Sequence, residues 1–143
     1  MPMIDIYAAV GLFPDTKKLA REAAETLKAV EQVPDIAMFR KNTAAFVHEL
    51  PTAAIANVDG DSAYVRIQVL TNAGALSREK QIEAVRRLTD LVAAAARDDS
   101  LKQRTWVMLT EAAPGGWGLW GHAHTNEELV AAARAEIAKT AAN

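Results

Sequence analysis

The chain has 143 residues, of which half are apolar and none is cysteine, and its 16 Lys and Arg against 18 Asp and Glu give a formal net charge of −2. This length and balance predict one folded domain, residues 1–143, with a hydrophobic core, and they exclude an intrinsically disordered chain, disulfide bonds and thiol chemistry. No basic run indicates nucleic acid or a membrane surface as a partner, and no apolar run reaches the roughly 18 residues of a spanning helix, so we expect a cytoplasmic protein.

The first ten residues combine a strand pattern with a proline at position two. Ile4, Ile6 and Ala8 alternate with more polar neighbours, which predicts a half-buried strand. A small residue such as proline after the initiator normally allows Met1 to be removed, and Pro2 would then carry a free secondary amine on a rigid element. Pro2 is therefore a candidate general base. The alternative is that these terminal residues have no catalytic role.

A helix and a second strand follow the first strand. Asp15 can cap a helix over about residues 16–30, whose apolar stripe consists of Ala20, Ala23, Leu27 and Val30. Residues 43–50, just before Pro51, alternate in the way that predicts a strand. Residues 57–62 form a turn cluster.

The same pattern then occurs a second time. Residues 64–70 predict a strand, Ser77 caps a helix carrying Ile82, Val85, Leu88 and Val92, and residues 105–111 predict another strand. The halves, about residues 2–60 and 63–122, indicate a duplicated βαβ unit whose strands pair in parallel. We expect an α+β fold in which the tandem βαβ repeat forms a four-stranded sheet with two helices on one face.

The end of the chain adds a hairpin and a helix. The glycine-rich segment 111–121 follows a strand without opening a helix, so it predicts a hairpin, from Gly115 to Gly121, and not a phosphate loop. Thr125 and Glu128 form a capping-box pattern that opens an Ala-rich helix over about residues 126–141.

Met1-Pro2, the duplicated βαβ unit and the 111–121 hairpin together resemble the tautomerase superfamily over about residues 2–122. The resemblance is to members with two fused units, such as the cis-3-chloroacrylic acid dehalogenase and malonate semialdehyde decarboxylase groups, whose halves resemble the 4-oxalocrotonate tautomerase subunit. It implies a homotrimer in which an N-terminal proline moves protons next to carbonyl groups. We expect no cofactor.

Other functional residues of the superfamily do not match this sequence. The arginines of those families fall near Leu12, Ala73 and Leu76, and the dehalogenase histidine falls near Ala29. Trp117 lies where the tautomerases place an aromatic wall of the pocket, and Trp106 falls close to another arginine position. The resemblance therefore implies a retained base and an apolar wall, without the groups used for dehalogenation or decarboxylation.

Proton transfer by Pro2 requires an apolar environment and a donor for the enolate oxygen. Desolvation lowers the pKa of an amine, and Trp106, Trp117 and Phe39 are candidates to supply it, or are core aromatics. Candidate substrate-binding donors beside the predicted strand ends are Arg40, Lys41, Asn42 and Asn72, and His48, on the predicted second strand, is a candidate to donate or relay a proton. Each of these has the alternative of a solvated charge or a hydrogen-bonded structural residue.

The leading hypothesis is a tautomerase or isomerase that uses Pro2 as general base on a small carbonyl substrate. The alternatives are a ferredoxin-like binding module or a tautomerase-fold protein without catalysis. His122 and His124 have the spacing of one part of a metal site, but no third ligand has matching spacing, so we expect no metal.

Overall fold

The computed structural model describes residues 1–143. Its elements, in chain order, are β1 (Met3–Ala9), α1 (Thr16–Glu31), α2 (Ala37–Lys41), β2 (Ala44–Leu50), η1 (Thr52–Ala54), β3 (Val65–Thr71), α3 (Arg78–Ala96), η2 (Asp99–Arg104), β4 (Thr105–Glu111), β5 (Trp117–Leu119), β6 (His122–His124) and α4 (Asn126–Ala142). The expected α+β class is confirmed. The short helix α2 and the two 3₁₀ turns have no counterpart in the elements expected from the sequence.

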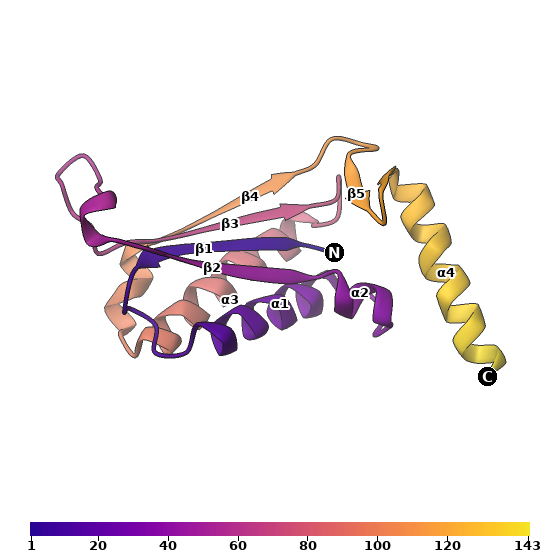
Figure 1. Ribbon diagram of the computed structural model, residues 1–143, viewed down its shortest axis with the longest axis horizontal. Helices are drawn as coiled ribbons and strands as arrows, with labels where there is room; N and C mark the ends of the chain where they lie inside the picture. The colour runs from indigo at the N-terminus through magenta and orange to yellow at the C-terminus, as the bar shows by residue number, and fades with distance from the viewer.

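The two βαβ units form one mixed sheet. The strand order is β2-β1-β3-β4, with β1–β2 and β3–β4 parallel and β1–β3 antiparallel. Parallel neighbours need a crossover, and α1 and α3 supply one in each unit. Both helices lie on the same face of the sheet (Figure 1).

The main core lies between the sheet and these two helices. Alternation along β1 and β3 buries Ile4, Ile6 and Ile67 completely. From α3, Leu88 and Val92 are buried as predicted, but Ile82 and Val85 of the predicted stripe are exposed, and Ala84 and Ala93 are buried instead. From α1, Leu19 is buried with the predicted Ala23, Leu27 and Val30.

The other face of the sheet is not covered by a helix of this chain. Its side chains include Phe46 on β2, Leu70 on β3 and Trp106 on β4, which are 54%, 38% and 45% exposed. Large apolar side chains at this exposure on three strands of one sheet face are typical of an interaction surface. We call this surface the open sheet face.

Several chain segments meet at one end of the sheet. β1 and β2 begin there and β3 and β4 end there, and α1 returns to the same end. The N-terminus, α2, the β5–β6 hairpin and α4 are gathered at this end (Figure 1). The hairpin strands lie a few residues later than predicted, with the turn at Trp120-Gly121. None of the helices is both long and apolar enough to cross a membrane.

Candidate functional site

The N-terminal amine is buried and forms an ion pair with a buried carboxylate. The Met1 nitrogen donates to both Glu31 oxygens, at 3.1 Å to Oε1 and 3.2 Å to Oε2. The two side chains are only 1% and 4% exposed. Chain termini are commonly mobile and hydrated. This terminus is instead buried and held in place by its contacts with Glu31.

The fold brings these two charges together from 30 positions apart in the chain. β1 runs away from the N-terminus, and α1 returns across the sheet and ends at Glu31, beside the start of β1. Gln32 then adopts a left-handed conformation, with φ of 58°, which ends the helix. The end of α1 is therefore the element that positions the carboxylate.

A small apolar cluster surrounds the terminus. Met1 packs with Met38 of α2, Trp117 of β5, and Leu129 and Ala133 of α4, and all five are buried. We call this set the N-terminal cluster. It is separate from the main core and joins the first residue to the C-terminal segments. The amine thus lies in an apolar environment that is largely closed to water.

Two further polar contacts hold α4 over this end of the sheet. Glu136 accepts a hydrogen bond from the Met38 backbone nitrogen at 3.2 Å. Asn126, at the first turn of α4, donates to the Ala73 carbonyl oxygen at 2.8 Å. The helix therefore contacts both α2 and the loop after β3, and the N-terminal cluster lies beneath it.

Two buried polar atoms beside the terminus have no hydrogen-bond partner, the Asn72 Nδ2 and the Thr43 Oγ1. The antiparallel register pairs Met3 with Leu70, and its continuation by two residues brings Asn72 level with Met1. Thr43 precedes Ala44, whose backbone nitrogen donates to the Pro2 carbonyl oxygen. Unpaired buried donors are rare because each costs free energy, and they often have a functional reason. The Asn72 Nδ2 is thus a buried donor without a partner next to the terminus.

Burial is the largest influence on the pKa of the Met1 amine and lowers it from the ordinary value of 8.0. Desolvation disfavours the charged form, whereas the Glu31 carboxylate opposes the shift by favouring the ammonium. The two effects act in opposite directions on the same nitrogen. The balance between them sets how much free amine exists at neutral pH.

This shift makes stability depend on pH. Because the folded chain binds the amine proton less tightly than the unfolded chain, the free energy of unfolding should rise with pH up to about 8 and then level off. In Glu31→Gln the opposing charge is lost, so this rise should be larger. Denaturant unfolding between pH 6 and 9 measures both, with Glu25→Gln, an exposed paired residue of the same helix, as control. Equal slopes in the two variants would contradict the role of the ion pair.

The structure places some predicted site residues at this end of the molecule. Trp117 lies in the N-terminal cluster, Phe39 packs against it, and Asn72 lies beside the terminus. Asn42 is close in sequence to the cluster residue Met38, but its Nδ2 donates to the Met38 carbonyl oxygen at 2.7 Å and so caps α2.

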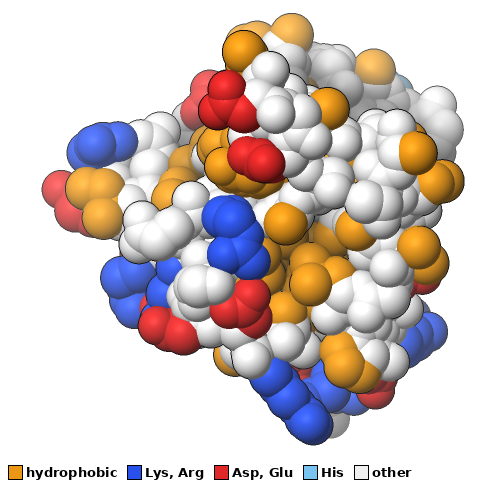
Figure 2. Space-filling model, turned by 90° about the vertical axis from the view of Figure 1, so that its left-hand side faces the viewer, with side chains coloured by type: hydrophobic (Ala, Val, Ile, Leu, Met, Phe, Trp, Pro, Cys, Tyr) orange, Lys and Arg blue, Asp and Glu red, His pale blue; other side chains and the backbone are white.

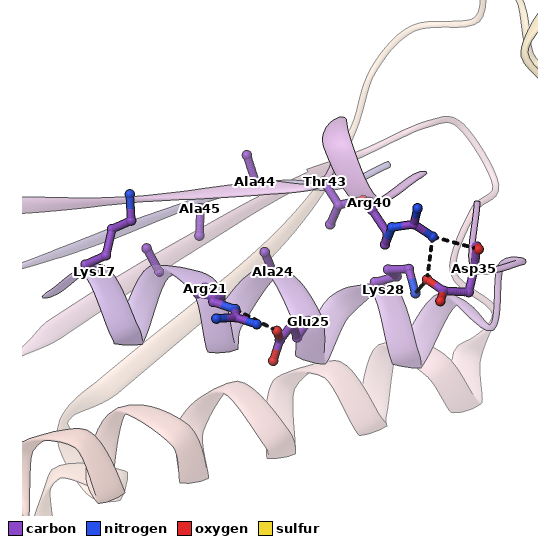
Figure 3. A pocket seen from close by; sticks show the side chains of 11 residues that line it. Lys17, Arg21, Ala24, Glu25, Lys28, Asp35, Arg40, Thr43, Ala44 and Ala45 are labelled. Carbon is purple, nitrogen blue, oxygen red and sulfur yellow. Dashed lines mark hydrogen bonds and ion pairs between the residues drawn. The ribbon is translucent and has the colours of Figure 1, made fainter. Parts of the chain in front are cut away.

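Arg40 is also at this end, but Asp35 engages its guanidinium. Its Nη1 lies 3.3 Å from Asp35 Oδ1, and Lys28 reaches the same oxygen at 2.8 Å. These residues line a groove of about 600 Å³ between α1, α2 and β2, which also contains Lys17, Arg21 and Glu25 (Figure 3). Four alanines also line this groove, and three of its four cations form ion pairs with carboxylates. Arg40 is therefore not directed at the terminal amine in this structure.

His48 and Trp106 lie at the opposite end of the sheet. His48 Nε2 donates to Asp5 Oδ1 at 2.6 Å and the ring stacks on Tyr7. Trp106 stacks on Tyr64 with ring centroids 4.6 Å apart. Figure 2 views the molecule from this end and shows hydrophobic side chains exposed between charged ones. Within one chain, neither residue belongs to the site at the N-terminus.

The hairpin histidines have separate partners. His122 Nε2 lies 3.0 Å from Glu128, whose pKa is lowered chiefly by the Thr125 backbone nitrogen and then by His122. His124 Nδ1 donates to the Trp117 carbonyl oxygen at 3.3 Å. The contact of His124 fixes the hairpin beside the N-terminal cluster.

Sequence reasoning did not identify Glu31 as part of this site. Its position at the end of α1 was a signal that could have identified it. An acidic residue in the last turn of a helix is unfavourable, because it lies next to the negative end of the helix dipole. Such a residue needs another reason for its position. The ion pair with the terminal amine supplies that reason.

Solved structures with the same fold are known. A fused 4-OT symmetric trimer has a TM-score of 0.72 at 17% identity, covering 89% of this chain and 98% of that chain. Pt0534 inactivated by 2-oxo-3-pentynoate has a TM-score of 0.71 at 17% identity, covering 84% and 93%. A member of the cis-3-chloroacrylic acid dehalogenase (cis-CaaD) family has a TM-score of 0.62 at 16% identity, covering 83% and 80%.

At these identities the similarity establishes a shared fold. It confirms the expected fold, which the chain shares with the fused 4-OT structures. No protein-family model matches the chain, and no curated protein matches its sequence.

Proposed function

We propose that this chain, once Met1 has been removed, uses the Pro2 amine as general base for proton transfer next to the carbonyl of a small substrate. The observation that supports this most is the buried ion pair between the terminal amine and Glu31 inside an apolar cluster. A terminus with no chemical role needs no such environment. The fold shared with Pt0534 and with the cis-CaaD family member agrees with this proposal.

Removal of Met1 would change the site in two ways. In the structure the Pro2 nitrogen is part of a tertiary amide and has no basic lone pair, so loss of Met1 frees the amine. Met1 is also 3% exposed as a residue, and its side chain packs with Met38, Trp117 and Leu129. Its loss would leave an apolar space next to the new terminus in which a substrate can bind.

The proposed reaction moves a proton from one atom of the substrate to another through the amine. The Pro2 nitrogen takes a proton from the carbon next to the carbonyl, and the electron pair moves onto the carbonyl oxygen to give an enolate. The unpaired Asn72 Nδ2 is our candidate to donate a hydrogen bond to that oxygen. The proton then returns from the nitrogen to the enolate oxygen, which gives the enol, or, where the substrate carries a double bond conjugated with the enolate, to the far carbon of that double bond, which completes an isomerisation.

The expected substrate is small and carries few negative charges. Leu12, Ala73 and Leu76 occupy the positions where the related families carry arginines, and Arg40 is paired with Asp35. A carboxylate placed in an apolar site without a cation costs several kcal/mol, by order of magnitude. Ketones, aldehydes and monocarboxylates should therefore be preferred to dicarboxylates.

The assembly proposed for the chain is a homotrimer. Its support is the open sheet face, which exposes large apolar side chains on three strands, and the fused 4-OT structures of the same fold, which are described as trimers. Burying such a face between copies removes apolar area from water and closes the assembly.

A charged substitution on the open sheet face should prevent this assembly. Phe46→Glu would place like charges of several copies in one interface, so we expect monomers at micromolar concentration, whereas Ile82→Glu on α3 should leave the trimer intact. Both positions are 54% exposed, which makes them a matched pair. Sedimentation equilibrium measures the mass of each variant. A native chain that sediments as a monomer would argue against the trimer.

The function is tested by a screen for exchange of carbonyl-adjacent protons with deuterium. Enolisable ketones, aldehydes and 2-keto acids are incubated in D₂O with chain that begins at Pro2, and NMR follows the loss of the proton signal. Labelling by 2-oxo-3-pentynoate, which inactivates Pt0534, provides a second readout because an amine can add to its conjugated triple bond. A ferredoxin-like binding module would give binding without exchange and no label on Pro2.

A further inference from the structure

We propose that Glu31 is a positioning residue for the Pro2 amine: its carboxylate holds the proton on that nitrogen between abstraction and return. This inference rests on the proposed function and extends it to a residue outside the motifs of the resemblance. Glu31 would act through Pro2 and would not contact the reacting carbon atoms.

The position of Glu31 is unfavourable unless it has a cationic partner. It is the last residue of α1, where the helix dipole presents its negative end, and its side chain is 4% exposed. Burying a carboxylate without a partner is costly, and the terminal amine is the only group that donates to its oxygens. The fold therefore maintains this carboxylate for a positive charge at the N-terminus.

Glu31 remains within reach of the terminus after Met1 is removed. Consecutive backbone nitrogens are separated by about 3.5 Å, so the Pro2 nitrogen lies within about 7 Å of the Glu31 oxygens even if nothing moves. A change of side-chain rotamer or a small shift of the strand end would restore direct contact. The carboxylate would also have no other donor after the loss of Met1.

The other charged groups around this site already have their own partners. These are Lys80 of α3 on the Glu31 carbonyl oxygen at 2.9 Å, Lys28 on Asp35, Glu136 of α4 on the Met38 nitrogen, Glu111 of β4 on the Gly74 nitrogen, and His124 of β6 on the Trp117 carbonyl oxygen. Glu31 is thus the side chain placed to control the charge on the terminal amine.

This arrangement has a chemical consequence for the proton. When the Pro2 nitrogen takes a proton from carbon, it becomes a secondary ammonium, and the adjacent carboxylate stabilises that cation as an ion pair. No atom is lost, since the proton stays on nitrogen until it returns to the substrate. Without Glu31, the ammonium in an apolar site would lose its proton readily. The pKa of the Pro2 amine would then be lower, and the free amine would be a weaker base.

The test measures the pH dependence of amine labelling on chain that begins at Pro2. The rate at which 2-oxo-3-pentynoate labels the N-terminal peptide, read by mass spectrometry, follows the fraction of free amine and needs no turnover. In Glu31→Gln the midpoint of the curve of labelling rate against pH should move to lower pH by about one to three pH units. This is the usual range for the effect of a nearby opposite charge on a pKa. Glu25→Gln, exposed on the same helix, should not move the midpoint.

A second variant covers the case in which Glu31→Gln does not fold. Glu31→Asp keeps the charge but withdraws it by one methylene, so its midpoint should lie between those of the native chain and Glu31→Gln. An unchanged or higher midpoint in Glu31→Gln, or in Glu31→Asp where only that variant folds, would overturn the inference. A shifted midpoint with no deuterium exchange on any substrate would leave the Glu31 pair standing and reject the proposed function.

Discussion

Chain that begins at Pro2 should exchange carbonyl-adjacent protons about 10² to 10⁴ times faster than the same chain with residues attached before Pro2, which is the usual contribution of a general base. The reason is chemical: an acyl group on the Pro2 nitrogen makes a tertiary amide, which accepts no proton at neutral pH. The chain that retains Met1 should behave like an extended chain, because its own amine is one residue away and is paired with Glu31. Deuterium exchange followed by NMR gives both rates.

The comparison requires a defined N-terminus and a control for folding. Intact mass distinguishes chain with and without Met1, since the two differ by one methionine. A Gly-Ser extension before Met1 provides a chain whose amine is moved out of the site altogether. Full exchange activity in the extended chain would show that Pro2 is not the base, whatever group then performs the reaction.

The sequence predicted the fold well because its signals are local and repeated. The alternation of Ile4 and Ile6, the caps at Asp15 and Ser77, and the matching second half all lie within short segments. The part it predicted poorly is which face of a helix is buried. Ile82 fits the α3 stripe by spacing, yet it is 54% exposed, because the small residues Ala84 and Ala93 are buried on this helix instead.

The candidate site was predicted only in part, and the reason is that it depends on long-range geometry. Trp117 and Asn72 lie near the terminus as expected, since hairpin and strand ends converge there. Trp106 was grouped with them from its family position, but it stands at the start of β4, at the far end of the sheet. Glu31 was missed because only the return of α1 beside β1 makes its burial visible.

Desolvation and the Glu31 charge act in opposite directions on the terminal amine, and different residues control the two effects. Glu31 raises the pKa of the amine, whereas the N-terminal cluster lowers it by excluding water. A useful base needs both effects. The Glu31 charge keeps the amine basic, and desolvation by the N-terminal cluster keeps a share of the amine unprotonated at neutral pH. A variant that opens the N-terminal cluster to water should therefore raise the pKa of the amine, whereas Glu31→Gln should lower it.

Trp117→Ala should destabilise the C-terminal segments by about 3–5 kcal/mol, the usual cost of truncating a buried aromatic residue. Trp117 is 7% exposed and packs in the cluster beneath α4, which is separate from the main core. The loss should therefore appear as faster amide hydrogen exchange in α4, while β1 and β3 remain protected. Trp120→Ala, in the same hairpin but 63% exposed, is the matched control. It should change neither the stability of the C-terminal segments nor the amide exchange rate of α4.

The same variant should raise the labelling midpoint of the Pro2 amine. Water entering the space left by Trp117 would hydrate the ammonium, so that its pKa returns toward the ordinary range while Glu31 still favours the charged form. Less free amine would then exist at pH 7, and proton exchange should slow even though Pro2 and Glu31 are intact. If α4 loses protection and the labelling midpoint falls or stays constant, burial by the N-terminal cluster does not set the basicity of the amine, and Trp117 serves only to attach the C-terminal helix.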